Sequence, residues 1–139
     1  MTRSPKTFPP PRSHCPIRFA LDVVGDRWAL LIVRDLLFKS KHYFREFADS
    51  EERIATNILT DRLGKLEAHG IVTREQEASN RRNVRYELTR KGRELAPILL
   101  ELIRWSGKHD PTTAAPRSYL RRIDREREKL VVELLGPAS

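Results

Sequence analysis

The sequence of 139 residues contains a single cysteine, Cys15, and no long hydrophobic run. One cysteine excludes an internal disulfide, which fits a reducing compartment. A membrane-spanning helix needs about 20 consecutive apolar residues, and the N-terminus also has no apolar run of the kind found in signal peptides. We therefore predict a cytoplasmic protein that does not insert into a membrane.

The sequence also lacks the short motifs that mark common catalytic and metal sites. It has no CxxC, HExxH or GxSxG motif and no glycine-rich phosphate loop. Its four histidines are scattered along the chain: His14, His42, His69 and His109. The one metal site that the sequence leaves possible is therefore one assembled from histidines distant in the sequence. We predict no enzymatic activity, no catalytic residues, no metal and no cofactor.

Positive charge is what the sequence has in excess. It has 27 Lys and Arg against 19 Asp and Glu, a formal net charge of +8 and a pI of about 10.1. Such a balance in a small domain favours a polyanionic partner, namely DNA, RNA or an acidic membrane surface. A basic protein without any anionic partner is the alternative. The length suits one domain with a modest core.

Proline and hydrophobic spacing divide the chain into three parts. Residues 1–13 contain four prolines and predict a disordered arm, which is either solvated or in contact with DNA. Residues 14–110 hold the predicted folded domain, and residues 111–139 a linker and an amphipathic C-terminal helix. The stripe from Leu120 to Leu134 on that helix is either a dimer surface or part of the chain's own core.

Within residues 14–110 the apolar spacing predicts four helices, a hairpin and a further helix. The helices cover a short segment after Cys15, then residues 27–38 with Asp26 as N-cap, a short segment at 43–50, and about 55–69. Two alternating runs, at 71–77 and 84–89, surround a polar loop and predict a β-hairpin with a basic tip. The last helix starts at Thr89 and carries Pro97 inside its pattern, where a kink is expected.

This order predicts a mainly α fold with a small β-hairpin, a winged helix-turn-helix with additional N- and C-terminal helices. In such a fold the third core helix enters the major groove of DNA. The helix at 55–69 has Leu59, Leu63 and Leu66 on one side and short polar residues on the other. We expect the polar side to face DNA, and we interpret Gly64 as a position that lets the helix sit close to the groove.

Nine residues are the predicted DNA contacts. Asn57 can read adenine and Asp61 can accept from cytosine, while Thr56 and Thr60 suit a thymine methyl group or a phosphate. Arg62 and Lys65 lie beside this face and suit phosphates. Three arginines of the hairpin can hold phosphates or enter a minor groove: Arg81, Arg82 and Arg85. For each residue a solvated surface position is the alternative.

Several segments together resemble the HxlR family of bacterial winged-helix transcriptional regulators. They are "CPIRFALDVVGDRW", "LLIVRDLL", "YFREF", "LTDRLGKLEAHGIV" and "RYELTRKGREL", between Cys15 and about Trp105. The resemblance implies a homodimer, joined largely by its terminal helices, that binds a palindrome-like operator in double-stranded DNA. A two-fold dimer should address half-sites one or two DNA turns apart. Repression is the expected sign of regulation.

The chain departs from the family at the recognition helix and the wing. Ala55 stands where the family often has a capping serine, Gly64 replaces a longer side chain, and the wing lacks a frequent proline. Some family members sense oxidants through a cysteine at the position of Cys15, which here is either a redox sensor or only the start of a helix. A small-molecule effector is compatible with the sequence but not identified by it. A winged-helix module that binds protein or RNA is the alternative function.

Overall fold

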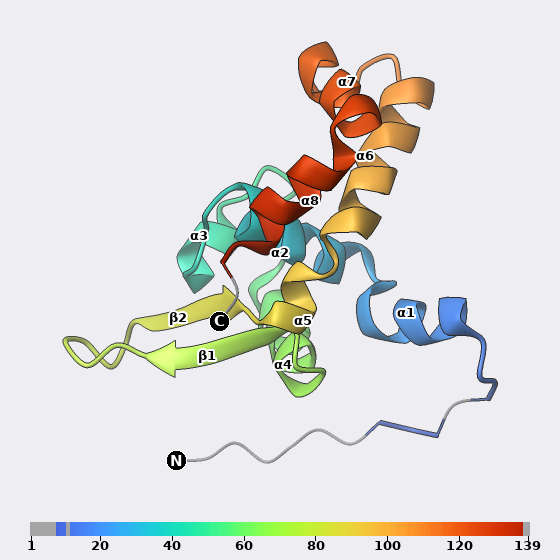
Figure 1. The fold of residues 1–139 in the computed structure, drawn as a ribbon. Coiled ribbons are helices and arrows are strands. Elements are labelled where there is room, and N and C mark those ends of the chain that lie inside the picture. Colours follow the sequence, from blue (N-terminus) through green and yellow to red (C-terminus); the bar gives the residue numbers. More distant parts are fainter. Residues whose placement is uncertain (1–7, 11, 138–139) are drawn as a thin grey trace. The chain divides into compact units, whose positions relative to one another are not determined.

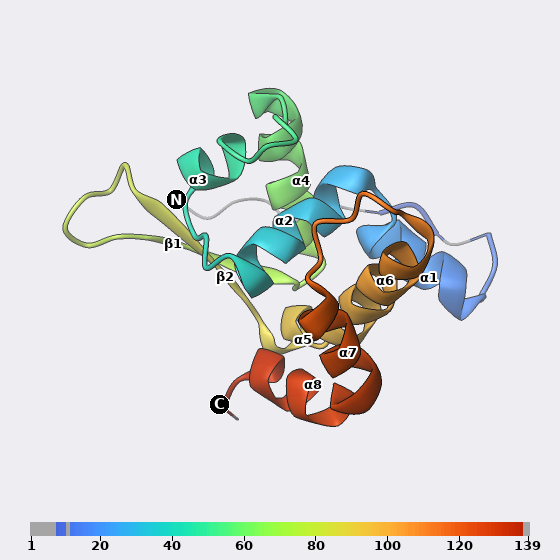
Figure 2. The ribbon, with the colours of Figure 1, turned by 90° about the horizontal axis from the view of Figure 1, so that it is seen from above.

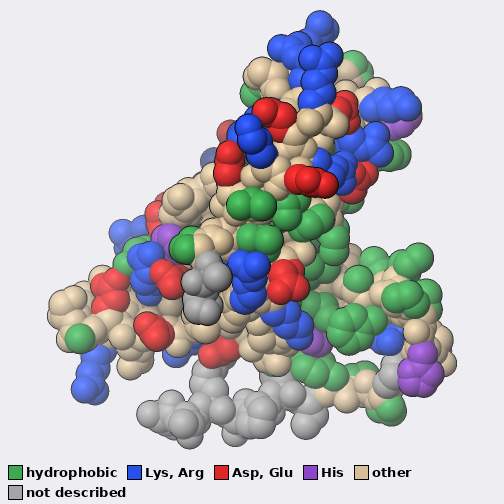
Figure 3. Space-filling view, viewed as in Figure 1, with side chains coloured by type: hydrophobic (Ala, Val, Ile, Leu, Met, Phe, Trp, Pro, Cys, Tyr) green, Lys and Arg blue, Asp and Glu red, His purple; other side chains and the backbone are tan. Residues whose placement is uncertain are grey.

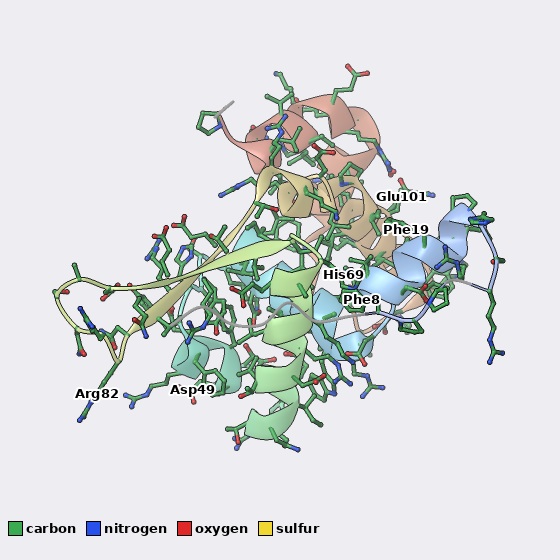
Figure 4. The ribbon with its side chains drawn as sticks, turned by 90° about the horizontal axis from the view of Figure 1, so that it is seen from below. Phe8, Phe19, Asp49, His69, Arg82 and Glu101 are labelled. Carbon is green, nitrogen blue, oxygen red and sulfur yellow. The ribbon has the colours of Figure 1, made fainter. Side chains whose placement is uncertain are left out.

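The computed structural model describes residues 8–10 and 12–137. The chain forms two compact units, of which the first runs to Gly92 and the second begins at Arg93. Most of the predicted arm, residues 1–7 and 11, lies outside the described residues. Phe8 is described, and its ring stacks on the ring of His69 with centroids 4.0 Å apart (Figure 4). None of the helices in the described ranges is long and apolar enough to cross a bilayer.

The first unit begins with four helices (Figure 1), and their order confirms the predicted one. The cap of the second helix is also as expected, because the Asp26 carboxylate accepts from the backbone N–H groups of Trp28 (2.8 Å) and Ala29 (3.2 Å). Buried apolar side chains from all four helices and from the strands that follow them form the core. The helices are α1 (Pro16–Val24), α2 (Arg27–Phe38), α3 (Phe44–Ala48) and α4 (Thr56–Ala68), and the core side chains include Val33, Phe47, Leu59, Leu63 and Leu66.

The predicted hairpin is formed by β1 (Val72–Gln76) and β2 (Val84–Leu88), which pair antiparallel. The segment before α3 joins β2 along its length, since Tyr43 bridges to Arg85 and the Tyr86 N–H donates to the carbonyl of His42 at 2.8 Å. Figures 1 and 2 both show the hairpin extending well beyond the helices of its own unit. The hairpin is therefore anchored through β2, while its loop extends outward, as a wing requires.

A short helix, α5 (Arg90–Arg93), follows the hairpin and is held against the start of β1. The Thr89 hydroxyl accepts from the N–H of Gly92 at 3.0 Å and so caps this turn, as expected. A Cβ atom at Gly92 would lie 2.2 Å from the carbonyl oxygen of Ile71. Glycine is needed here because the two backbones approach closely.

The prediction of a kinked helix through Pro97 is wrong. The helical pattern is interrupted after α5, and α6 (Ala96–His109) begins afresh with Pro97 in its first turn. Proline is well tolerated there, because the N–H that it lacks has no partner within the helix at that position. The apolar spacing is continuous across the break, which is why the pattern alone predicted a single helix.

The single C-terminal helix is also a wrong prediction, because the segment folds into α7 (Arg117–Arg125) and α8 (Arg127–Leu135). The chain turns at Glu126, and Arg122 then reaches Glu133 at 2.5 Å. In one straight helix these two residues would be separated by about 16 Å of axial rise. Ile123 and Leu130 are buried within the chain, so the centre of the stripe forms core and is not available to a partner.

Candidate nucleic-acid interface

Helix α4 has the two faces that the sequence predicts. Leu59, Leu63 and Leu66 are each at most 1% exposed. The polar candidates Thr56, Asn57, Thr60 and Lys65 are exposed, while Asp61 and Arg62 are half-buried. The candidate reading residues therefore share one accessible helix surface of the first unit.

Gly64 does not fit the interpretation made from the sequence, because it is buried. Its main chain is therefore hardly accessible to a ligand. Gly64 is thus not an accessible position at which the helix could approach a DNA groove more closely.

The first turn of α4 leaves its polar groups free for a ligand. Its N-cap is Ala55, which provides no side-chain hydrogen bond to the first N–H groups. Thr60 donates its hydroxyl to the carbonyl of Thr56 at 2.9 Å, which leaves its methyl group and an oxygen lone pair outward. The Asn57 amide is exposed and has no hydrogen bond to any described residue. It can both donate and accept, as recognition of adenine requires.

Arg62 has a different role from these exposed residues, because it links α4 to α2. Its guanidinium contacts the Asp26 carboxylate at 3.0 and 3.1 Å, and this is the carboxylate that caps α2. Arg62 also donates to Asp61 at 2.6 Å, and Lys65 lies 3.4 Å from the same carboxylate. The hydrogen bond from Arg62 lowers the pKa of Asp26. Arg62 thereby fixes both the rotation of α4 and the position of the Asp61 side chain.

The turn between α3 and α4 is fixed by a polar cluster that sequence reasoning missed. Asp35, on α2, is 2% exposed and accepts from the Ser50 hydroxyl at 2.6 Å. Arg34 donates to Asp35 at 2.8 Å and reaches forward to Glu52 at 2.6 Å. Lys41 completes the cluster through the Ser50 hydroxyl at 2.6 Å. The "RD" pair in "LLIVRDLL" is its only signal in the sequence, since the partners are 15 to 18 residues away.

We expect the Arg34–Glu52 pair to make stability depend on acid pH. The hydrogen bond from Arg34 lowers the pKa of Glu52 to about 2. Because the folded-state pKa is lower than the unfolded one of about 4.3, the contribution is fully present above that value and is lost as the pH falls towards about 2. Glu52 is partly exposed, so solvent screening limits the contribution to about 1 kcal/mol or less.

Urea denaturation between pH 6 and pH 2 measures this effect. The Glu52→Gln variant should lose stability at pH 6 and show a weaker acid dependence than the wild type. Glu51→Gln is the matched control, because Glu51 is exposed and has no ion pair within the described residues. Equal acid dependence in the wild type and Glu52→Gln would contradict the assignment.

The tip of the wing presents two arginines to solvent. Arg81 and Arg82 are exposed and lie in a loop closed by Asn80, whose side chain accepts from the Arg82 N–H at 3.0 Å. Figure 4 shows the Arg82 side chain pointing away from the rest of the hairpin. Neither guanidinium has a partner within the described residues, so both are available to an anion.

The third wing candidate, Arg85, is held within the chain. It donates to Glu87 at 3.0 Å and to the Tyr43 hydroxyl at 3.4 Å, and it lies 5.8 Å from the centre of the Tyr43 ring. Tyr43 also donates to Glu77 at the end of the hairpin. Tyr43 and Glu77 were not candidates from the sequence, because nothing in a single sequence relates residues 34 positions apart.

Cys15 lies at the start of α1 and is a free, exposed thiol. The backbone N–H groups of Arg18 and Ile17 lower the pKa of this thiol, and the charge of Arg18 adds to the effect. A lowered thiol pKa favours the reactive thiolate. Its role as a redox sensor remains a prediction.

Each unit also exposes a set of large apolar side chains. On α1 these are Ile17, Phe19 and Leu21, and Figure 3 shows hydrophobic side chains gathered over this helix. On α6 they are Ile98, Leu102 and Trp105, which follow one helix face. Neighbouring large apolar side chains that are exposed together commonly mark interfaces.

Comparison with known proteins places the chain among regulators. Residues 23–113 match the family model described as HxlR-like helix-turn-helix. The HTH-type transcriptional regulator YybR of Bacillus subtilis, itself uncharacterised, is 34% identical over 113 residues, covering 81% of this chain and 90% of YybR. The regulator sll1512 of Synechocystis, also uncharacterised, is 35% identical over 88 residues, and the match spans 63% of this chain and 64% of sll1512.

Two solved structures extend the comparison to the fold. The redox regulator HypR in its oxidised form is 36% identical with a TM-score of 0.60, covering 70% of this chain and all of HypR. The reduced form of the transcriptional regulator YodB from Bacillus subtilis is 28% identical with a TM-score of 0.58, covering 73% of this chain and 99% of YodB. The structural likeness thus includes the winged helix itself.

Proposed function

The chain belongs to the HxlR-like helix-turn-helix family and is a DNA-binding transcriptional regulator, and we propose that it is a homodimeric repressor of palindrome-like operators. The observation that carries this proposal is the exposed polar face of α4, held rigidly by the Asp35 cluster and by Arg62. The exposed arginines of the wing tip in the same unit supply the positive charge that duplex DNA requires.

The candidate contact residues differ in whether their side chains are exposed or already bonded within the chain. Those with exposed side chains meet DNA directly: Thr56, Asn57 and Thr60 at base edges, and Lys65, Arg81 and Arg82 at phosphates. Arg62 and Arg85 are already bonded within the chain, so we propose that they hold α4 and the wing in position and reach phosphates only secondarily. Asp61, oriented by Arg62, is the candidate acceptor for a cytosine amino group.

We propose that the dimer forms through the exposed apolar residues of α1 and α6. Their aromatic members, Phe19 and Trp105, are the side chains typical of buried interface centres. A two-fold dimer presents two copies of α4, and its operator should therefore consist of two inverted half-sites.

The proposal also covers where and how the protein works. A regulator of bacterial promoters acts in the cytoplasm, by binding and not by catalysis. HypR is described as a redox regulator, and Cys15 is the residue of this chain through which an oxidant could act. We assign no small-molecule effector. The alternative, a winged helix that binds protein or RNA, is less consistent with an α4 face that has no large apolar side chain.

Removing the wing charges tests DNA binding directly. In the double variant Arg81→Gln/Arg82→Gln, affinity for a mixed-sequence duplex should fall, and the log–log salt dependence should become shallower by about 0.9 for each phosphate that is no longer bound. Because phosphates carry no sequence, affinity should fall by a similar factor for all duplexes. Gel-shift titrations over a series of salt concentrations measure both quantities.

Lys108→Gln/Lys129→Gln is the control for net charge. Both lysines are exposed residues of the second unit, so this variant removes the same charge from outside the wing. An unchanged salt dependence in the wing variant would contradict phosphate binding by the wing. Tighter binding of the wild type to an RNA hairpin than to the duplex would favour the alternative function.

A further inference from the structure

Helix α7 carries a row of exposed arginines that its own unit does not use. Arg117, Arg121 and Arg125 follow each other at intervals of four residues, a rise of about 6 Å per interval. None of the three has a hydrogen bond or ion pair to a described residue. We call these three residues the α7 arginine row.

The other arginines of the second unit are all engaged within it. Arg122 pairs with Glu133, while Arg104 and Arg127 both pair with Glu101. Arg93 donates to the carbonyl of Leu134 at 3.1 Å. The unit has enough acceptors to hold these four, and the three members of the row are left to solvent or to a partner.

The orientation of the row is fixed by packing on the other side of α7. Ile123 is completely buried, and Leu120 lies against α6 at Gly107. A Cβ atom on Gly107 would stand 2.5 Å from the Cδ2 atom of Leu120, so the glycine allows a close approach of the two helices. With Leu120 and Ile123 held inward, the row faces outward. Figure 3 shows Lys and Arg side chains gathered over α7.

We infer that the α7 arginine row binds the phosphate backbone of duplex DNA, in addition to the contacts of α4 and the wing. This inference depends on the proposed function only in that DNA is the partner. Each DNA strand carries one charge per 3.4 Å of axis, so arginines spread over about 12 Å of helix can each meet a separate phosphate. Arginine binds phosphate through its planar fork of donors, which makes it well suited to this contact.

The chemistry of the row favours a nucleic acid over an acidic protein. Its exposed neighbours on α7 are Ser118 and Asp124, and no large apolar side chain is exposed beside it. Protein interfaces normally have an apolar or aromatic centre, whereas DNA interfaces are polar and strongly basic. The family match ends at residue 113, so this surface is a feature of the chain outside the matched region.

Salt-dependent binding of purified full-length protein to a mixed-sequence duplex of about four helical turns, roughly 40 base pairs, tests the inference. The variant Arg121→Gln/Arg125→Gln should flatten the log–log salt dependence by about 1.8, or 0.9 for each contact. Lys108→Gln/Lys129→Gln removes equal charge from the same unit outside the row and should leave the slope nearly unchanged. Helix content by circular dichroism should be the same in all variants, because the replaced side chains are exposed.

A second variant should change duplex affinity and its salt dependence in the opposite direction. Asp124 is exposed on the same helix, three residues after Arg121, and its carboxylate repels a nearby phosphate. Asp124→Asn should therefore bind the duplex more tightly and show a steeper salt dependence, which a solvated surface position would not do.

The outcomes separate this inference from the proposed function. If the wing variant flattens the salt dependence and the row variant does not, the row does not bind DNA although the protein does. If the row variant and the lysine control flatten it equally, the effect is only one of net charge and the inference is overturned. If wild-type protein does not bind the duplex at low salt, the proposed function fails first.

Discussion

Replacing Asp35 by alanine should lower the free energy of unfolding by about 3–5 kcal/mol, the range typical of breaking a buried ion pair from one side. The carboxylate is almost completely buried and accepts from both Ser50 and Arg34. Its removal leaves the Ser50 hydroxyl without its acceptor in a site that water hardly reaches, and it leaves Arg34 with Glu52 alone. Lys41, 3.7 Å from the same carboxylate, also loses its charge partner.

Urea denaturation followed by circular dichroism measures this destabilisation. Asp35→Asn keeps an acceptor for the Ser50 hydroxyl and should cost less than the alanine variant. Asp49→Ala is the control, because Asp49 is an exposed aspartate just before Ser50 (Figure 4) and surface replacements usually change stability by less than about 0.5 kcal/mol. If Asp35→Ala were no more destabilising than Asp49→Ala, the cluster would not hold the turn before α4.

Replacing Asn57 by alanine should remove discrimination at one base pair of each half-site, at a cost of about 1–3 kcal/mol in operator binding. The amide is exposed and forms no bond within the described residues, so its truncation should leave folding unaffected. This separates the effect from that of Asp35→Ala, which acts through stability.

Selection of bound sequences from a random duplex pool measures the discrimination, because the pool contains every candidate operator. The wild type should enrich a two-fold symmetric sequence, and Asn57→Ala should enrich the same sequence with one position relaxed. Arg81→Gln/Arg82→Gln should weaken binding while enriching the unchanged sequence. Identical sequence preferences for the wild type and Asn57→Ala would show that α4 does not read bases through this residue.

The two classes of variant address different steps between sequence and function. Asp35, Arg34 and Arg62 set where α4 lies, whereas Asn57 and Arg81 are the residues proposed to contact the DNA itself. Operator binding can be lost either because α4 is displaced or because a DNA contact is removed. Only the first class should also change the unfolding transition, which makes combined measurements of stability and binding decisive for each residue.

The sequence by itself determined the parts of the fold that depend on neighbours in the chain. The apolar spacing and the Asp26 cap predicted α2 over the residues that it occupies, and the leucine face of α4 is as expected. Alternation around a polar loop predicted the hairpin. These features follow from helix and strand periodicity and from local capping, for which a few residues carry all the information.

Only the tertiary structure decided which candidate side chains are free and which are bonded. Arg62 is bonded to Asp26, 36 positions away, and Arg85 to Tyr43, 42 positions away. The turn at Glu126 likewise depends on how apolar side chains pack in the second unit, and periodicity does not change there. Such pairs arise from the path of the folded backbone, so residue type and spacing identified the charged candidates but could not divide them into those that hold the fold and those that remain free to bind DNA.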